Sequence, residues 1–206
     1  METNTRRNAI KTLSATLLTG IMLPEAHAEN SAVNDILKPF YLPPAAPLEA
    51  GPAGINIRTW VRSTQTNNQF SCVEAAVAPK TMGPPPHIHK ELDEICFVLE
   101  GTASVLVGTE VYEVKAGGFH LRPRGIAHTF WNASNEKLRF MDLYFNQNFE
   151  DYLEELFFKI YADMAKYKLT PMDAGIGKRM ADLDKRFGIT MFLEQRQAIV
   201  DKYGLK

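Results

Sequence analysis

Short alternating runs of residues between positions 54 and 146 predict strands. β-Branched side chains recur at every second position from Ile55 to Val61, and valines recur on both sides of Gly108-Thr109. A last run extends from Leu138 to Phe145. A period of two places alternate side chains on opposite faces of a strand, and glycine and proline separate the runs. The pattern therefore predicts a mostly β fold, a sandwich or barrel, over residues 54–146.

After residue 146 the spacing of apolar residues changes to that of a helix. One apolar stripe comprises Phe149, Leu153, Leu156, Phe157, Ile160, Tyr161 and Met164. We expect this stripe to face the barrel or a partner. A second helix is expected to end near Gly188, and a third is expected over residues 191–203. Residues 147–206 are thus predicted to be a C-terminal helical extension.

The N-terminal residues before the barrel have two different compositions. Residues 1–28 combine Arg6-Arg7, a short apolar run and the small-x-small ending Ala26-His27-Ala28. They resemble a signal peptide of the twin-arginine type, which implies export to the periplasm of a bacterium. Residues 29–53 contain five prolines, and proline fixes φ and removes a backbone donor. We expect an extended, proline-rich arm there.

Composition excludes several functional classes. Of the 206 residues, 45% are hydrophobic and 23% charged, and the net charge is −1. This balance argues against a nucleic-acid partner, which needs clustered lysine and arginine. Apolar runs are too short for a permanent membrane span. Cys72 and Cys96 cannot make a disulfide scaffold or a four-cysteine zinc site; they either pair with each other or remain buried free thiols, and the inward parity of Cys96 favours thiols.

The distribution of histidines predicts a metal site. Four of the five histidines lie close together in the chain: His87, His89, His120 and His128. His87 and His89 share one face if they lie in a strand. Glu94 follows an expected bend, and His128 follows the turn Pro123-Arg124-Gly125. Three imidazoles and one carboxylate that meet in one cavity would bind one divalent transition metal, namely Fe, Mn, Ni, Cu or Zn.

Two motifs around these residues resemble those of the cupin superfamily. The first is His87-x-His89, four residues, Glu94, six residues, Gly101; the second is Gly117, Pro123-x-Gly125, His128 and Asn132. The residues that flank these motifs and the C-terminal segment KRFGITMFLE are similar to those of small quercetin 2,3-dioxygenase-like cupins. The resemblance implies a single double-stranded β-helix, or jelly-roll barrel, with His87, His89, Glu94 and His128 as metal ligands.

The expected function follows from the number of ligands. Four protein ligands leave coordination positions open, and an open position is typical of catalytic sites. Together with the resemblance to quercetin 2,3-dioxygenase-like cupins, this implies an exported metal-dependent dioxygenase that binds an oxygen of a flavonol- or catechol-like small molecule and uses dioxygen. Glu94 is either the fourth ligand or a base for the substrate hydroxyl. Two alternatives are a non-oxidative lyase, isomerase or decarboxylase acting on a small carboxylate, and a metal-containing binding barrel without turnover.

Strand parity predicts which side chains surround the metal. Cys96 and Val98 share the face of Glu94, and Phe130 shares the face of His128 and offers an apolar surface to a planar ring. These three, with His120 and Arg122, are the predicted substrate-binding residues. Asn132 is expected to satisfy backbone groups near the turn.

Three points stay open at the level of sequence. His120 and Arg122 are solvated if Phe119 and Leu121 face inward; otherwise they line the cavity as a proton shuttle and an anion clamp. Asp93 replaces Glu94 as ligand if the register moves by one residue. Barrel edges and the apolar helical stripe predict a homodimer whose symmetry the sequence does not give.

Overall fold

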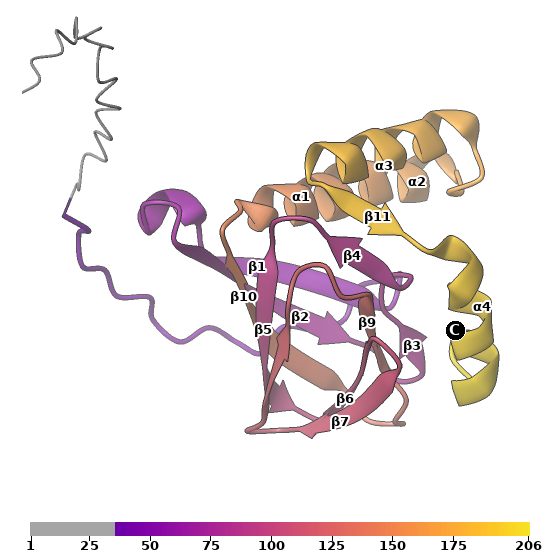
Figure 1. Ribbon diagram of the computed structural model, residues 1–206, viewed down its shortest axis with the longest axis horizontal. Coiled ribbons are helices and arrows are strands. Elements are labelled where there is room, and N and C mark those ends of the chain that lie inside the picture. The colour runs from indigo at the N-terminus through magenta and orange to yellow at the C-terminus, as the bar shows by residue number, and fades with distance from the viewer. Residues whose placement is uncertain (1–35) are drawn as a thin grey trace, which may run out of the picture. The chain divides into compact units, whose positions relative to one another are not determined.

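The structure of the protein is a computed structural model that describes residues 36–206 (Figure 1). The predicted signal peptide, residues 1–28, and the first part of the predicted arm lie outside the described residues. Residues 36–50 contain no helix or strand, which agrees with a proline-rich extended segment. None of the helices in the described part is long and apolar enough to cross a membrane.

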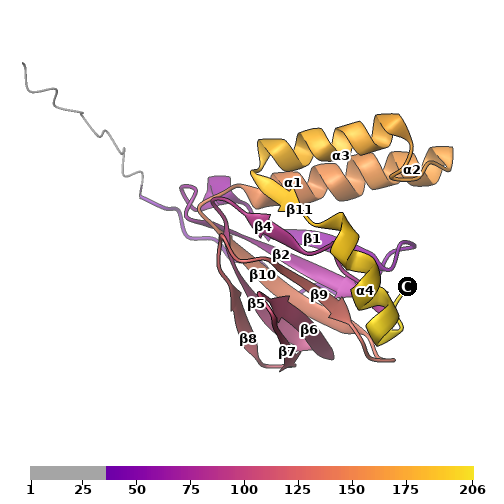
Figure 2. The ribbon, with the colours of Figure 1, turned by 45° about the vertical axis from the view of Figure 1, so that its right-hand side comes forward.

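The predicted β fold is confirmed as two antiparallel sheets that face each other in a jelly-roll barrel (Figure 2). One sheet has five strands in the order β1, β2, β10, β5, β8: Ile55–Val61, Phe70–Val77, Leu138–Phe145, Asp93–Glu100 and Phe119–Arg122. The other contains β11, β4, β9, β6 and β7 in that order: Ile189–Met191, His87–His89, His128–Asn132, Thr102–Val107 and Glu110–Lys115. The short strand β3, Thr81–Met82, pairs with β9.

Alternation along the strands builds the interior of the barrel. Along β10, Leu138, Phe140, Asp142 and Tyr144 are buried, whereas the residues between them are partly exposed. Residues Ala75, Val98, Val105, Leu138 and Phe140 from both sheets pack together and fill one end of the barrel. This apolar packing supplies the hydrophobic stabilisation of the sheets.

Helices cover the other end of the barrel (Figures 1 and 2). A continuous helical segment comprises α1 (Phe149–Glu155), the π-helical turn η2 (Leu156–Ile160) and α2 (Tyr161–Tyr167), and α3 (Ala174–Arg186) packs beside it. The predicted apolar stripe is confirmed: its members pack on Ile57, Val73, Leu92 and Tyr144 of the barrel. The stripe is therefore an internal contact of this chain.

The end of the chain follows the prediction with one exception. Helix α3 ends just before Gly188, where φ is +63°, and α4 (Leu193–Tyr203) corresponds to the predicted third helix. Helix α4 packs beside Trp131 of β9 and Met82 of β3. Strand β11, which lies between the two helices and pairs with β4, was not predicted from the sequence. Its three residues are too few to show a strand period.

Candidate metal centre

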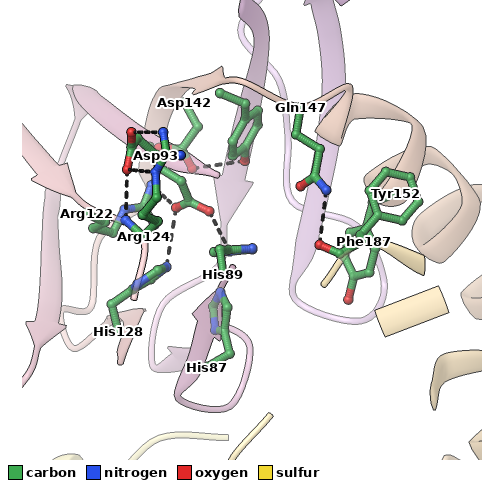
Figure 3. Close-up of polar contacts among 12 residues, drawn as sticks. His87, His89, Asp93, Arg122, Arg124, His128, Asp142, Gln147, Tyr152 and Phe187 are labelled. Carbon is green, nitrogen blue, oxygen red and sulfur yellow. Dashed lines mark hydrogen bonds and ion pairs between the residues drawn. The ribbon is translucent and has the colours of Figure 1, made fainter. Parts of the chain in front are cut away.

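The four expected ligands meet at the helix-covered end of the barrel (Figure 3). Their donor atoms all lie within 4.8 Å of one another, and all four side chains are buried. Nε2 of His89 is 2.9 Å from Oε1 of Glu94, and Nε2 of His128 is 3.7 Å from Oε2. Donors on opposite sides of one first-row metal are about 4 Å apart, because each bond is about 2.1 Å long. The spacing fits one ion.

Both sheets contribute to the cluster. His87 and His89 come from β4, and His87 pairs directly with His128 of β9 in the same sheet. Glu94 comes from β5 of the facing sheet. Gly125, with φ +75°, donates its N–H to the carbonyl of His89 at 2.9 Å, so the turn before His128 is tied to the strand of the first two ligands. The two motifs are thus joined by backbone pairing as well as by their side chains.

Backbone carbonyls fix the orientation of two rings. Nδ1 of His87 donates to the carbonyl of Pro85, and Nδ1 of His128 donates to the carbonyl of Ile126, both at 2.9 Å. Since a carbonyl only accepts, each Nδ1 carries the proton, and each Nε2 keeps a lone pair toward the cluster. Burial lowers the pKa of His87 to about 3, with further lowering by His128 and His89, so this imidazole is neutral near pH 7. Neutral imidazole is the form that binds metals.

Unpaired buried nitrogen atoms provide a test of whether these residues fit a metal. Nε2 of His89 and Nε2 of His128 are buried, and apart from their contacts with the Glu94 carboxylate neither has a partner within the described residues. A buried polar atom without a full set of partners costs free energy, so such atoms usually mark the site of a bound water or ion. Two unpaired imidazole nitrogens beside a carboxylate form a donor set that suits a divalent transition metal.

A buried arginine holds the fourth ligand. Nη2 of Arg122 is 3.1 Å from Oε2 of Glu94, and the same guanidinium donates to Asp142. Tyr144 donates its O–H to Oδ2 of Asp142 at 3.2 Å. Burial alone would raise the pKa of Glu94, but the Arg122 charge holds it well below its usual range. Glu94 is therefore a carboxylate ready to bind a cation, and the low pKa makes it a weak base.

The structure resolves the open orientation of His120 and Arg122. Both face the barrel interior, Arg122 fully and His120 partly, whereas Phe119 and Leu121 lie on the outside. His120 packs on Tyr112 with ring centroids 4.7 Å apart, and burial, together with the charge of Arg122, lowers its pKa. Arg122 already has two carboxylate partners, which leaves little of its charge for a substrate anion.

The remaining predicted wall residues lie deeper in the barrel. Cys96 and Val98 share the face of Glu94, as parity predicts, and both belong to the packed core at the far end. Phe130 packs edge-on against Phe140 at 5.0 Å, with the Arg122 guanidinium 5.8 Å above its ring. Asn132 donates to the carbonyls of Val77, Ala78 and Glu136, as expected. Contact between these wall residues and a substrate remains a prediction.

Two alternatives from the sequence are decided by the geometry. Asp93 lies outside the cluster of donor atoms, and its carboxylate accepts hydrogen bonds from the backbone and guanidinium of Arg124 at the edge of the site. Its position one residue before Glu94 places it on the outer face of β5. Cys72 and Cys96 are both buried free thiols, as the inward parity of Cys96 favours.

Phe149 and strand β11 support the histidines, and neither role was predicted from the sequence. The ring of Phe149 meets His89 edge-on, with centroids 5.0 Å apart, and stacks on Tyr152 at 4.7 Å. Strand β11 pairs Ile189 with His89 and Met191 with His87. The only signals in the sequence were Phe149, as the first residue of the apolar stripe, and the β-branched pair Ile189-Thr190 after Gly188. Neither identifies a partner more than 50 residues away in the chain.

Comparisons with known proteins give one family match and a set of similar solved structures. Residues 73–144 match the cupin domain family. No curated protein matches the sequence. Similar solved structures include KdgF from Halomonas sp., with 19% identity over 46% of this chain and 80% of that chain and a TM-score of 0.41. A structure of oxalate oxidase has 24% identity over 58% of this chain and 64% of that chain, with a TM-score of 0.43. Procruciferin from Brassica napus has 18% identity over 48% and 26%, with a TM-score of 0.41.

Proposed function

Because residues 73–144 match the cupin domain family, we propose that the protein binds one divalent transition metal through His87, His89, Glu94 and His128 and uses it to transform a small molecule. The observation that carries this proposal is the convergence of three buried imidazoles on one buried carboxylate of low pKa, with all donor atoms within 4.8 Å of one another. The three histidines and Glu94 supply a net charge of −1 to a divalent ion. The centre keeps a positive charge that attracts a substrate oxygen.

The reaction that we propose is oxidative cleavage of an electron-rich flavonol- or catechol-like compound. A redox-active metal, when bound, supplies Lewis acidity to the substrate oxygen and electrons for dioxygen chemistry. Arg122 and the Asp142–Tyr144 pair hold Glu94 in place. Phe149, with Tyr152 behind it, packs against His89 and excludes water on that side.

A second candidate is a non-oxidative reaction on a small carboxylate. Its support is the inward position of Arg122, since an anionic substrate needs a cationic partner. The two existing carboxylate partners of Arg122 weaken this candidate. A third candidate, a metal-binding barrel without turnover, draws support from the complete burial of His89 and His128.

Oxygen consumption separates the three candidates. The metal-loaded protein is assayed with a panel of flavonols and catechols in an oxygen electrode, with His128→Ala as the ligand variant. Oxygen uptake that disappears in the variant supports the dioxygenase. Turnover of a carboxylate under anaerobic conditions would support the second candidate. Metal at full occupancy with no turnover of the flavonols, the catechols or the carboxylate would support the third candidate.

We further propose that the protein is exported by the twin-arginine route, on the strength of Arg6-Arg7 and Ala26-His27-Ala28. Replacement of both arginines by lysine tests this route. Expression in a bacterium with fractionation should give a processed wild-type protein in the periplasm and an unprocessed variant in the cytoplasm. An unprocessed wild-type protein in the cytoplasm would refute export.

A further inference from the structure

The three histidines of the cluster differ in what supports the second ring nitrogen of each. Nδ1 of His87 and Nδ1 of His128 each donate to a backbone carbonyl two residues earlier, at 2.9 Å. Nδ1 of His89 is buried and has no partner within residues 36–206. A histidine that binds a metal almost always donates its second N–H to an acceptor, which fixes the tautomer and the direction of the ring. The third histidine thus lacks the support that the other two have.

The chemistry of His89 determines what kind of support it needs. Its Nε2 lies 2.9 Å from Oε1 of Glu94 and is the nitrogen directed into the cluster. A neutral imidazole carries one N–H, so Nε2 offers its lone pair to a metal only when the proton is on Nδ1. Nδ1 is then a buried donor, and a buried donor without an acceptor destabilises the site. His89 therefore needs an acceptor at Nδ1.

Gln147 carries a buried acceptor that lacks a donor. Its Nε2 donates to the carbonyl of Phe187 at 3.1 Å. This bond fixes the orientation of the amide, because a carbonyl only accepts and the amide nitrogen only donates. Oε1 of Gln147 is buried and has no partner in the described part of the chain. Gln147 and His89 are therefore complementary, since one has an unpaired acceptor and the other an unpaired donor.

The start of helix α1 brings Gln147 to the histidine. Gln147 lies two residues before Phe149, and the ring of Phe149 meets the His89 ring edge-on, with centroids 5.0 Å apart. The rings of Phe149 and Phe187 are also in contact, with centroids 6.3 Å apart. Figure 3 shows Gln147 and Phe187 on the side of His89 that faces away from His128. The amide thus lies beyond the ring of His89, outside the cluster.

The segment that accepts the amide hydrogen bond runs beside the same histidine. Phe187 is followed by Gly188, whose carbonyl accepts the N–H of Lys90 at 3.0 Å. The next residue, Ile189, pairs with His89 in the sheet. The amide hydrogen bond therefore joins two segments of the chain that both contact His89.

The two unpaired atoms need a mediator. Since neither atom has a partner, His89 and Gln147 do not bond directly. The mediator must accept the N–H of the imidazole and donate to the amide oxygen. A cation cannot accept, and a simple anion cannot donate. A water molecule does both, and buried waters typically join polar groups of this kind.

Solvent reaches the outer side of Gln147 through a cavity. The cavity has a volume of about 560 Å³. It is lined by Gln147, Asn148, Asp151, Glu155, Arg186 and Phe187. Because Gln147 and Phe187 form part of this wall, a water molecule has only these two side chains to pass on its way to the inner side of the amide.

The carboxylate of Asp184 is a rival acceptor near His89. Its Oδ1 accepts the O–H of Tyr152 at 2.8 Å, and the ring of Tyr152 stacks on Phe149. Burial raises the pKa of Asp184, whereas Tyr152 and His89 lower it. Asp184 is half-buried and already has a donor, whereas Oε1 of Gln147 is buried and has none. An unpaired acceptor therefore costs more at Gln147, which favours Gln147 as the partner.

We propose that one water molecule joins Nδ1 of His89 to Oε1 of Gln147, and that Gln147 is a positioning residue for this ligand. The water accepts the Nδ1–H and donates to the amide oxygen, so that Nε2 keeps its lone pair toward the cluster. This inference rests on the proposed metal site and adds the residue that orients its third histidine.

Zn²⁺ affinity of the full-length protein, measured by competition with a chromogenic chelator, tests the role of the amide oxygen. Gln147→Met removes the acceptor and should weaken Zn²⁺ binding by about 10–100-fold. Gln147→Glu keeps an acceptor oxygen at the same chain length and should retain the wild-type affinity or exceed it. The matched control is Asn148→Leu, in the same cavity wall, whose amide donates to Asp151 at 2.7 Å and not toward the cluster. This control should bind Zn²⁺ as the wild type does.

The comparison separates positioning from a merely structural role. Gln147→Met and Gln147→Glu both lose the hydrogen bond to Phe187, and only the first loses the acceptor. Equal affinities of these two variants overturn the proposal. So does a loss of affinity in Asp184→Leu with none in Gln147→Met, which would assign the role to Asp184.

A high-resolution crystal structure gives a second readout that does not need the metal. It should show a water within about 3.2 Å of both Nδ1 of His89 and Oε1 of Gln147, and no water there in Gln147→Met. A wild-type structure without this water overturns the proposal. If the wild-type protein binds no Zn²⁺, the proposed metal site is wrong, and the metal-free structure still decides whether the water joins the two residues.

Discussion

Arg122 and Glu94 form an ion pair of 3.1 Å that links the wall of the barrel to the candidate metal centre. The pair lies on adjacent strands, in direct register, and both side chains are buried. Glu94 contacts His89 and His128 on its other side. The Glu94 carboxylate thus lies between the Arg122 guanidinium and the candidate metal site. Arg122 keeps Glu94 ionised and directs it toward that site.

Loss of the arginine should destabilise the protein strongly. Arg122→Met leaves Glu94 and Asp142 buried without a cation, so we expect the free energy of unfolding to fall by about 3–5 kcal/mol. Urea denaturation of the metal-free protein measures this change. The control is Arg124→Met, which removes an exposed partner of Asp93 and should cost at most about 1 kcal/mol. Equal effects of the two substitutions would contradict the account.

The aromatic contact on His89 gives a second prediction. Phe149→Ala removes a buried ring that packs on His89, Tyr144 and Tyr152, and it should cost about 3–5 kcal/mol of stability. Phe158→Ala, on the same helical segment but 54% exposed, is the matched control and should change stability by about 0.5 kcal/mol or less. Thermal unfolding followed by circular dichroism compares them. Similar midpoints for the two variants would show that Phe149 does not pack as described.

Strand parity and turn residues account for what the sequence predicted at the site. His87-x-His89 lies in one strand, and Gly125 provides the positive φ of the turn before His128, so local rules place these ligands. Parity alone could not say which side of β8 faces inward, because Phe119 and Leu121 looked as suitable for a core as His120 and Arg122. The ion pair of Arg122 with Glu94 and Asp142 determines this orientation, and it is a contact between distant residues. The same holds for Phe149 and β11, which reach His89 only through the fold.

The two thiols should be unreactive in the folded protein. Burial raises the pKa of Cys72 to about 12 and that of Cys96 to about 11, so neither forms a thiolate at pH 8. Titration with a chromogenic disulfide reagent should detect no thiol in native protein and two thiols in guanidinium chloride. Rapid labelling of the native protein, or a Cys72–Cys96 disulfide in it, would be inconsistent with the structure.

Glu74 predicts a loss of stability in acid. Its carboxylate accepts hydrogen bonds from Arg58 and from the indole of Trp60, and although burial opposes the shift, these partners lower its pKa below the usual 4.5. A carboxyl with a lower pKa in the folded state stabilises the fold above the unfolded pKa, and this contribution disappears as pH falls below 4.5.

Denaturant unfolding from pH 7 to pH 3 measures that contribution. Glu74→Gln should lower stability at pH 7 by about 1.5–3 kcal/mol and should flatten the decline below pH 4.5. Glu100→Gln, at a half-exposed position of the same sheet, is the control and should leave the pH profile unchanged. A Glu74→Gln profile parallel to that of the wild type would argue against this role.

The metal content of the purified protein tests the central claim most directly. Inductively coupled plasma mass spectrometry should find one divalent transition metal per chain in the wild type and in His120→Ala, which removes a histidine outside the cluster. His128→Ala, and the pair His87→Ala and His89→Ala, should lose the metal while their circular dichroism keeps its β-sheet signature. A wild-type chain that binds no metal on reconstitution, or ligand variants that retain it fully, would contradict the account.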